Sequence, residues 1–438
     1  MRVLRAPLFW LAIAAIVRVV LVQPWIWPDS HRYLSEAESL LRGAGYATDG
    51  VLETYFPPGY PVFVAAVFWV WHSLPFLVAV QIALSIASCW LIYLAVRPRG
   101  DLPAVIALAA MALHFWIALF AGAVLAETLA IFLASLLVHL LSKVEQDTTS
   151  VLVALCVGVS CMSLALTVPL MAPVGAAIVL SVAFERRKRF AFLAALFGGA
   201  LLLYVPWQIH CQRAIGEMPL LTLYRFPKEA YLKRGLALWI RTWARTQDDM
   251  NAYVSAKYFD SIPDDAFASR EQRSRLTSLH AQYREQLRIA DKNRLSDSLD
   301  RLTLVHDRAF EAAALRRMRE RPFSFHVVLP LIRSFHLWFD EPVYGDKMPI
   351  RFIGRIVWTS VSILYVLYPL LFLGTAALAL LSRKPIPIAI CIGTIAYTFL
   401  SAYTALGEER RNFEFIPLLL FLLFYLPARK PRRLRGSG

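Results

Sequence analysis

The sequence is poor in cysteine and in charge, and it carries no nucleotide-binding motif. Its five cysteines are unevenly spaced and lie mostly inside apolar segments, which excludes a disulfide framework and a zinc-binding pattern. Neither a P-loop nor a dinucleotide-binding fingerprint is present, and no internal repeat or low-complexity linker divides the chain. The cysteines are therefore expected to act as packing residues.

Apolar residues dominate the chain instead. Of 438 residues, 58% are apolar and only 18% are charged, and the mean hydropathy of +0.53 is well above that of a soluble globular domain. The apolar residues form blocks of about twenty without acidic or basic interruption, which is the length at which a helix crosses a bilayer. The blocks predict a membrane protein that crosses the bilayer many times.

The formal net charge of +15 is explained by basic residues that orient the chain in the membrane. Lysine and arginine cluster at the ends of apolar blocks, where they set the orientation of a membrane protein. These clusters are expected to face the cytoplasm, and no nucleic acid is expected as a partner. They are Arg2 and Arg5, Arg97 and Arg99, Lys143, Arg186 to Arg189, Arg383 and Lys384, and Arg429 to Arg435.

The predicted fold class is an all-α, polytopic transmembrane helical bundle. The first block has no small-residue cleavage site, so it is expected to be a retained anchor with a cytoplasmic N-terminus. Segments 58–74 and 323–339 are expected to be interfacial or re-entrant, because counting either as a span would put basic clusters outside. About ten spans fit: 6–27, 77–96, 102–122, 127–142, 151–168, 170–184, 190–207, 355–381, 386–406 and 415–427.

Three parts of the chain follow from this topology. Residues 1–209 are expected to form an N-terminal transmembrane catalytic module with a first outer loop at 28–76. Residues 210–350 are expected to form a mostly helical periplasmic region that includes the interfacial helix 323–339. Residues 351–438 are expected to contain C-terminal transmembrane helices and a basic cytoplasmic tail.

The first outer loop opens on a polar run, 27–33, that leads into a short helix expected over 35–41. Asp29 and Ser30 are of the residue types that cap helices. A carboxylate at the mouth of a bundle can also face a cavity, so Asp29 is both a candidate cap and a candidate catalytic residue. Arg32 and Tyr33 are candidates for contact with a substrate.

A proline-rich turn lies further along the same loop. The run 54–61 contains three prolines and Gly59, which fix an unusual backbone path just before an apolar segment. It is either a rigid re-entry turn or part of a groove whose aromatic residues line a prenyl chain or stack on a sugar. Tyr55, Pro58 and Tyr60 are its candidate substrate-binding residues.

Glu127 lies within an unbroken apolar run, 102–141, that is twice the length of one span. An ionisable group at such a place is costly and usually marks function. Because the run folds back on itself, Glu127 is expected near the outer turn, on the same side as Asp29. The alternative is a structural partner for a nearby histidine or arginine.

Four charges in 407–412 are expected between two late spans, again on the outer face. They fit a solvated turn with an internal ion pair. They fit a phosphate diester equally well, because arginine offers forked donors. Glu409, Arg410 and Arg411 are therefore candidate substrate-binding residues.

Taken in order, these pieces resemble the bacterial relatives of the protein O-mannosyltransferases and of the lipid A aminoarabinose transferase, which are glycosyltransferases with the C-type membrane fold. The resemblance covers mainly 1–215. Its features are Pro28-Asp29-Ser30 with Tyr33 and Ala37, Gly43, Gly45-Tyr46, Pro57-Pro58-Gly59-Tyr60-Pro61, Glu127, Pro206-Trp207 and Glu409-Arg410.

The resemblance implies an acidic residue of the first outer loop at the catalytic centre, which maps to Asp29, and a second in the next outer loop, which maps to Glu127. It also implies a polyprenyl-phosphate-linked sugar as donor, with a glycan, lipid or protein acceptor, at the bacterial inner membrane. The aminoarabinose branch has a basic residue just before its proline pair, where this chain has Phe56. Arg32, Arg410 or Arg411 would then have to hold the phosphate.

The chemistry fits these residue types. A polyprenyl phosphate leaves as a stable anion, so displacement at the sugar's anomeric carbon needs no general acid, unlike glycoside hydrolysis with its two carboxylates. Asp29 would take the proton of the acceptor hydroxyl. An arginine would stabilise charge on the phosphate, a role that a divalent metal ion could also fill. No cofactor is otherwise expected.

Two other functions are compatible with a polytopic membrane protein. A transporter or lipid flippase is expected to have charges or broken helices inside the membrane, and often two related halves. The sequence indicates neither. A structural subunit of an envelope complex would tolerate substitutions at Asp29, Glu127 and Arg410.

Overall fold

The computed structural model describes residues 6–21, 24–48, 51–54, 57–146, 150–186, 189–216, 218, 234–246, 249, 262–293, 297–339, 370–381, 384–404 and 415–425. Over these ranges the protein is almost entirely helical, and the strands are a single hairpin of two-residue strands. The predicted all-α fold class is confirmed. The chain divides into two compact units, one formed by Met1–Arg225, Lys347–Tyr397 and Arg410–Gly438, the other by Phe226–Asp346 and Thr398–Glu409.

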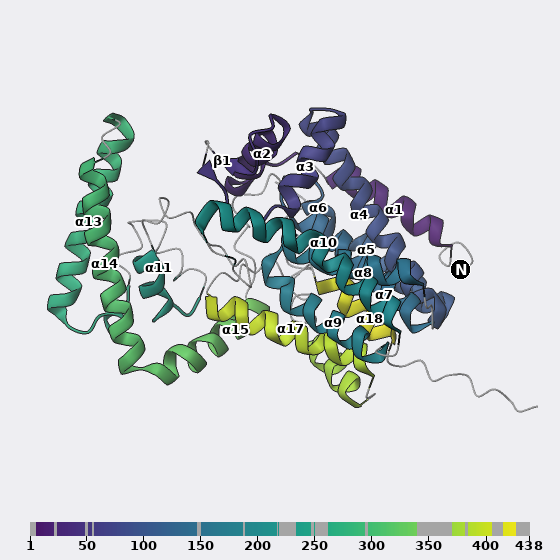
Figure 1. The fold of residues 1–438 in the computed structure, drawn as a ribbon. Coiled ribbons are helices and arrows are strands. Elements are labelled where there is room, and N and C mark those ends of the chain that lie inside the picture. The colour runs from purple at the N-terminus through teal and green to yellow at the C-terminus, as the bar shows by residue number, and fades with distance from the viewer. Residues whose placement is uncertain are drawn as a thin grey trace, which may run out of the picture. The chain divides into compact units, whose positions relative to one another are not determined.

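The first unit is a bundle of apolar helices (Figure 1). Its elements are α1 (Pro7–Leu21), α2 (Pro28–Leu41), β1 (Ala47–Thr48), β2 (Val51–Leu52), α3 (Gly59–Val70), α4 (Leu74–Val96), η2 (Arg97–Arg99), α5 (Asp101–Leu113), α6 (Phe115–Phe120), α7 (Glu127–Glu145), α8 (Val151–Thr167), η3 (Pro169–Met171), α9 (Ala172–Glu185), α10 (Phe190–Ile215), helix Leu370–Leu381, the first part of α17 (Pro385–Thr404) and α18 (Ile416–Tyr425).

Among the described residues, four helices are long and apolar enough to cross a membrane: Leu74–Arg99, Glu127–Glu145, Phe190–Ile215 and Pro385–Tyr403. They overlap the spans predicted at 77–96, 127–142, 190–207 and 386–406. Other predicted spans and the segment 58–74 correspond to shorter apolar helices. Of the span predicted at 355–381, only 370–381 lies within the described residues.

Three predicted boundaries are wrong. The first span ends at Leu21 rather than at residue 27. The short helix predicted at 35–41 begins at Pro28, because proline is well suited to the first helical turn. The span predicted to end at residue 207 continues to Ile215, and the αL conformation of Gly216 closes it.

The span predicted at 102–122 is broken at His114, whose extended backbone separates α5 from α6. His114 Nδ1 accepts a hydrogen bond from Ile117 N and so caps α6. The break leaves backbone carbonyls at the C-terminal end of α5 without partners in the helix. Arg18 of α1 donates hydrogen bonds to two of them, Met111 O and Ala112 O. The bundle therefore holds a buried cation and a broken helix that the hydropathy pattern did not indicate.

Helices α8 and α10 lie side by side and approach unusually closely (Figure 1). A Cβ atom at Gly158 would lie 2.0 Å from Leu196 O, and one at Gly199 would lie 2.4 Å from Leu155 O. Small residues that let backbones touch are typical of helix packing in membranes. The two glycines therefore fix the position of α10 against α8.

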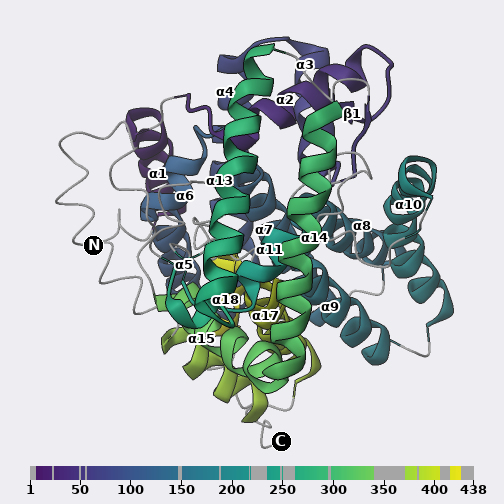
Figure 2. The same cartoon turned by 90° about the vertical axis from the view of Figure 1, so that its left-hand side faces the viewer.

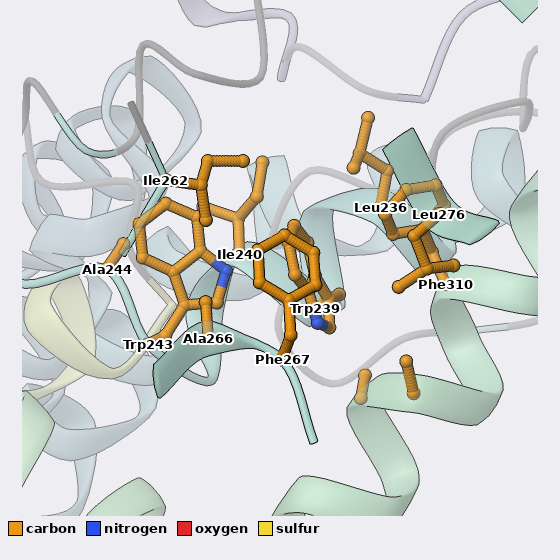
Figure 3. Close-up of a cluster of buried hydrophobic side chains, with 12 residues drawn as sticks. Leu236, Trp239, Ile240, Trp243, Ala244, Ile262, Ala266, Phe267, Leu276 and Phe310 are labelled. Carbon is orange, nitrogen blue, oxygen red and sulfur yellow. The ribbon is translucent and has the colours of Figure 1, made fainter. Parts of the chain in front are cut away.

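The second unit contains α11 (Arg234–Arg241), η6 (Asp264–Ala266), α13 (Arg270–Asn293), α14 (Asp297–Glu320), η7 (Ser324–Val328), α15 (Leu329–Phe339) and the last turns of α17. Helices α13 and α14 run side by side (Figures 1 and 2). Trp239 of α11 is fully buried between Trp243, Phe267 and Phe310 (Figure 3). Aromatic packing thus gives this polar, helical unit a core of its own.

Candidate functional site

The chain segment before α2 is bound to the loop before α7. Trp25 N donates to Gly122 O at 3.0 Å, and Val124 N donates to Trp25 O at 3.0 Å, which forms a parallel β-bridge between Trp25 and Ala123. The Ser30 hydroxyl, fully buried, donates to Val124 O at 2.8 Å. The segment leading into α2 and the loop before α7, which the sequence analysis treats separately, are therefore joined by hydrogen bonds.

Asp29 lies in the first turn of α2 and is half-buried. The cap position is Trp27, whose backbone N–H donates to the Ser30 hydroxyl. The sequence left open whether Asp29 or Ser30 caps this helix. Neither occupies the cap position, but the Ser30 hydroxyl accepts the hydrogen bond of the backbone N–H at that position. A carboxylate in the first helical turn is also favoured by the helix dipole.

Glu127 is the first residue of α7 and only 4% exposed. It follows directly after the loop that binds Trp25 and Ser30, and the Thr128 hydroxyl donates to Phe120 O at the other end of that loop. The carboxylate acts electrostatically on the Tyr60 hydroxyl. A buried acidic group therefore stands where the loop before α7 meets the segment before α2.

Gln81 of α4 connects Tyr60 to the same loop. The Tyr60 hydroxyl donates to Gln81 Oε1 at 2.6 Å, and Gln81 Nε2 donates to Ala121 O at 3.1 Å and to Ala123 O at 2.8 Å. The Tyr33 ring packs edge-on against Tyr60, with centroids 5.0 Å apart. The structure thus brings together Tyr33, Tyr60 and the loop that carries Glu127.

The proline-rich turn reaches the end of α8. Pro58 caps α3, and a Cβ atom at the following Gly59 would lie 2.5 Å from the Thr167 hydroxyl oxygen and 2.7 Å from Leu166 O. Only glycine permits this close approach. The turn is therefore held tightly against the end of α8.

Arg32 lies close to two acidic side chains, Glu53 and Glu36. Its Nε atom donates to Glu53 Oε2 at 2.9 Å, its Nη2 atom also bonds that oxygen, and its Nε atom lies 3.5 Å from Glu36 Oε1. Burial, and then the neighbouring Glu53, raise the pKa of Glu36 to about 8. The predicted phosphate ligand Arg32 is therefore already paired with Glu53, while the raised pKa of Glu36 keeps that second neighbour mostly protonated near pH 7.

An aromatic cluster anchors the β-hairpin that follows α2. Tyr46 donates to Glu36 Oε2 at 3.0 Å and packs edge-on against Trp207 and His210 of α10. The His210 Nε2 atom lies 2.6 Å from Glu53 O. Trp207 is buried in this cluster, which joins α10 to the β-hairpin.

Four candidate residues lie outside the described part of the chain: Tyr55, Glu409, Arg410 and Arg411. Within the described residues, no three histidine, cysteine, aspartate or glutamate side chains gather where they could hold a metal ion.

The opposite end of α7 gathers basic residues. Arg99 Nη2 donates to Glu145 Oε2 at 2.7 Å, and Arg186 Nη2 donates to Val144 O at 2.6 Å. Lys384 also acts electrostatically on Glu145. Arg99, Arg186 and Lys384 belong to clusters predicted to share one side of the membrane, and these three residues meet at one end of the bundle.

Sequence reasoning missed Gln81, Glu36, Glu53 and His210. Gln81 is an uncharged polar residue inside an apolar block, and its full burial gives it a role that charge counting overlooks. Glu36 and Glu53 lie in the segment 28–76 with Asp29 and the prolines, and neither is among the candidates predicted from the sequence. The available signal was that two acidic residues, Glu36 and Glu53, follow Arg32 in the same segment and could pair with it.

The sequence matches no family model, and the search of the curated proteins gives no match. The structure is similar to crystal structures of the oligosaccharyltransferase of Archaeoglobus fulgidus: the apo form at 13% identity and a TM-score of 0.48, and a complex with zinc and sulfate at 12% and 0.48. A third, tethered to an acceptor peptide containing the NVT sequon, matches at 12% and 0.47. Each match covers 95% of this chain, which spans about half the length of those proteins, at 50%, 48% and 49%.

Proposed function

We propose that the chain is a membrane glycosyltransferase that moves a sugar from a polyprenyl-phosphate donor to an acceptor on the outer face of the membrane. The observation that carries the proposal is the junction of two loops: Ser30 and Trp25 bind the loop before Glu127. Asp29, the neighbour of Ser30, and Glu127 are thereby held at one end of an apolar bundle. The order of motifs resembling C-type glycosyltransferases supports the same proposal.

In the proposed mechanism, Asp29 accepts the proton of the acceptor hydroxyl as that oxygen attacks the anomeric carbon of the sugar. The bond from that carbon to the phosphate oxygen breaks, and the polyprenyl phosphate leaves as an anion. A general base of this kind contributes about 100- to 10,000-fold to the rate. Asp29 suits the role because it is half-buried, and so within reach of both solvent and bundle.

Glu127 and the tyrosines would organise the acceptor side of the site. Glu127 is buried and acts electrostatically on Tyr60, and the Tyr60 hydroxyl is held by Gln81, so Tyr60 is fixed before any substrate binds. Preorganised groups of this kind lower the cost of orienting a substrate. Tyr33, Tyr55, Pro58 and Tyr60 are the residues proposed to contact the sugar or the prenyl chain.

The phosphate ligand proposed here is the C-terminal pair, Arg410 and Arg411, with Glu409 as a neighbour. Arg32 is the weaker candidate because Glu53 and Glu36 already engage its guanidinium group. A forked guanidinium is suited to the phosphate diester of the donor.

The direct test is accumulation of donor. Lipid extracts from cells that lack the protein, analysed by mass spectrometry, should contain a polyprenyl-phosphate sugar that the unsubstituted gene removes. Asp29→Asn should fail to remove it at normal protein levels, whereas Asp101→Asn, an exposed acid at the other end of the bundle, should remove it fully. Full activity of Asp29→Asn would exclude Asp29 as the base.

A transporter is the second candidate, and the structure gives one observation in its favour. The broken helix at His114 and the buried Arg18, which the sequence did not indicate, are typical of sites inside transporters. Arg18 is occupied by carbonyl groups and by the Ser85 hydroxyl, which fits a structural role instead. Substrate flux into proteoliposomes without any acceptor would favour the transporter.

A further inference from the structure

The helical segment 323–339 has one face packed on its own unit and one face turned outward. Phe325, Leu329, Arg333 and Leu337 recur every four residues and are all buried. The side chains of Phe323, Leu331 and Phe335 are 69%, 59% and 59% exposed. Large apolar side chains on an outward face are unusual for a polar unit and indicate a binding surface.

Arg333 fixes which face is outward. Its Nε atom donates to Ala244 O at 2.9 Å, its Nη1 atom to Ala402 O at 3.1 Å, and its Nη2 atom to Arg241 O at 2.6 Å. A rotation of α15 that buried Leu331 or Phe335 would break these three bonds and leave a buried guanidinium without partners, which is costly. The apolar face is therefore a stable feature of the unit.

Basic residues precede this face at the corner between α14 and η7. Arg316, Arg319 and Arg321 are exposed, and Arg316 pairs with Glu320, the one acid between residues 315 and 339. An apolar helix face next to a basic cluster is the pattern of a helix that lies in the surface of an anionic bilayer.

We propose that Phe323, Leu331 and Phe335 insert into the surface of the membrane, and that Arg316, Arg319 and Arg321 bind the headgroups of anionic phospholipids there. The sequence predicts only that 323–339 is interfacial or re-entrant, and the proposal adds a charge-selective lipid contact. A lipid surface is favoured over a protein partner because exposed arginines directly precede an exposed apolar helix face, the combination that anionic bilayers bind. The contact would orient the second unit independently of any catalytic role of Asp29.

The experiment uses the full chain in nanodiscs with a spin label at Leu331→Cys. Ser278→Cys, on the exposed face of α13, is the matched control, and unsubstituted protein reports background labelling of native cysteines. Accessibility to oxygen and to a water-soluble nickel chelate is measured in zwitterionic phosphatidylcholine and in its mixture with phosphatidylglycerol. The charge-removing variant is Arg316→Gln/Arg319→Gln/Arg321→Gln, compared with Arg270→Gln/Arg275→Gln/Arg284→Gln on α13.

In the anionic mixture, the label at residue 331 should favour oxygen over nickel, and the label at 278 should favour nickel. Two changes should each lower the ratio of membrane-inserted to water-exposed label at residue 331 by at least about tenfold. One is the removal of phosphatidylglycerol, and the other is the substitution of Arg316, Arg319 and Arg321. The α13 variant should leave the ratio unchanged. Equal nickel access at 331 and 278 would overturn the proposal, as would protection at 331 that depends neither on lipid charge nor on the arginines, which would indicate a protein surface instead.

Discussion

The two ends of α7 hold their polar groups by different means. At the Glu127 end, uncharged groups are fully buried and bind backbone carbonyls: Ser30 to Val124, and Gln81 to Ala121 and Ala123. At the Glu145 end, partly exposed arginines bind a carboxylate and a carbonyl. Buried neutral hydrogen bonds fix loop positions, whereas exposed ion pairs contribute little to stability. The Glu127 end is therefore held by buried neutral hydrogen bonds, and the Glu145 end by contacts of partly exposed arginines.

The largest effect expected at the Glu127 end is that of Gly59→Ala. The added Cβ atom would lie 2.7 Å from Leu166 O, a backbone atom that cannot move cheaply, so the melting temperature in detergent should fall by the equivalent of about 3 kcal/mol. Gly198→Ala is the control, because a Cβ atom there meets nothing within 4 Å. Equal stability of the two variants would show that the turn is not held against α8.

Next in size is Gln81→Met, which keeps the side-chain volume and removes three hydrogen bonds. Ala121 O would be left buried without its donor, and the expected loss is about 2 kcal/mol in chemical unfolding, together with a fall in transfer rate. Ser88→Ala on the same helix, where the hydroxyl bonds only its own helix at Leu84 O, should change neither. Unchanged stability for Gln81→Met would remove the contrast between the two ends.

A pH series sharpens the comparison, because the Glu127 end also contains the buried Glu36. Its pKa is raised from 4.5 to about 8, so the folded state binds a proton that the unfolded state releases between those pH values. Stability from this group is therefore fully present below pH 4.5 and is lost as the pH rises through about 8. Glu36→Gln should flatten the fall in melting temperature from pH 6 to pH 9. Glu38→Gln, on the same helix, should keep the slope of the unsubstituted protein, and a slope unaffected by Glu36→Gln would contradict the assignment.

The smallest effect is expected at the other end. Arg99→Gln removes the ion pair with Glu145, and because the guanidinium is partly exposed the loss should be about 0 to 1 kcal/mol in the same unfolding assay. A loss of stability as large as that of Gln81→Met would mean that the ion pair at the Glu145 end stabilises the protein as much as the buried hydrogen bonds at the Glu127 end.

These differences explain which features were predictable from sequence. Helix type and the four long spans follow from apolar length, and the meeting of Arg99, Arg186 and Lys384 follows from charge at block ends. The break at His114 was missed because Arg18, which satisfies the carbonyls that the break leaves open, lies 93 and 94 residues from them in the sequence. Gln81 was missed for the same reason: its partners are Tyr60 of α3 and two carbonyls of the loop before α7, 21 to 42 residues away, and local periodicity carries no information about them.

The same limit applies to the candidate site. Asp29 and Glu127 could be proposed from residue type and order, since ionisable groups beside apolar blocks are conspicuous. The pairing of Arg32 with Glu53 could not, because a short β-hairpin folds residue 53 back onto α2. Positions that depend on a turn between two short strands are set by tertiary packing rather than by pattern.

The central claim is that Asp29 and Glu127 face the outside of the cell while Arg99 and Glu145 face the cytoplasm. The most direct measurement labels His31→Cys and Asp101→Cys, both at exposed positions, with a membrane-impermeant maleimide in intact and in permeabilised cells. The account predicts labelling of residue 31 in intact cells and of residue 101 only after permeabilisation. Labelling of residue 101 alone in intact cells would contradict it.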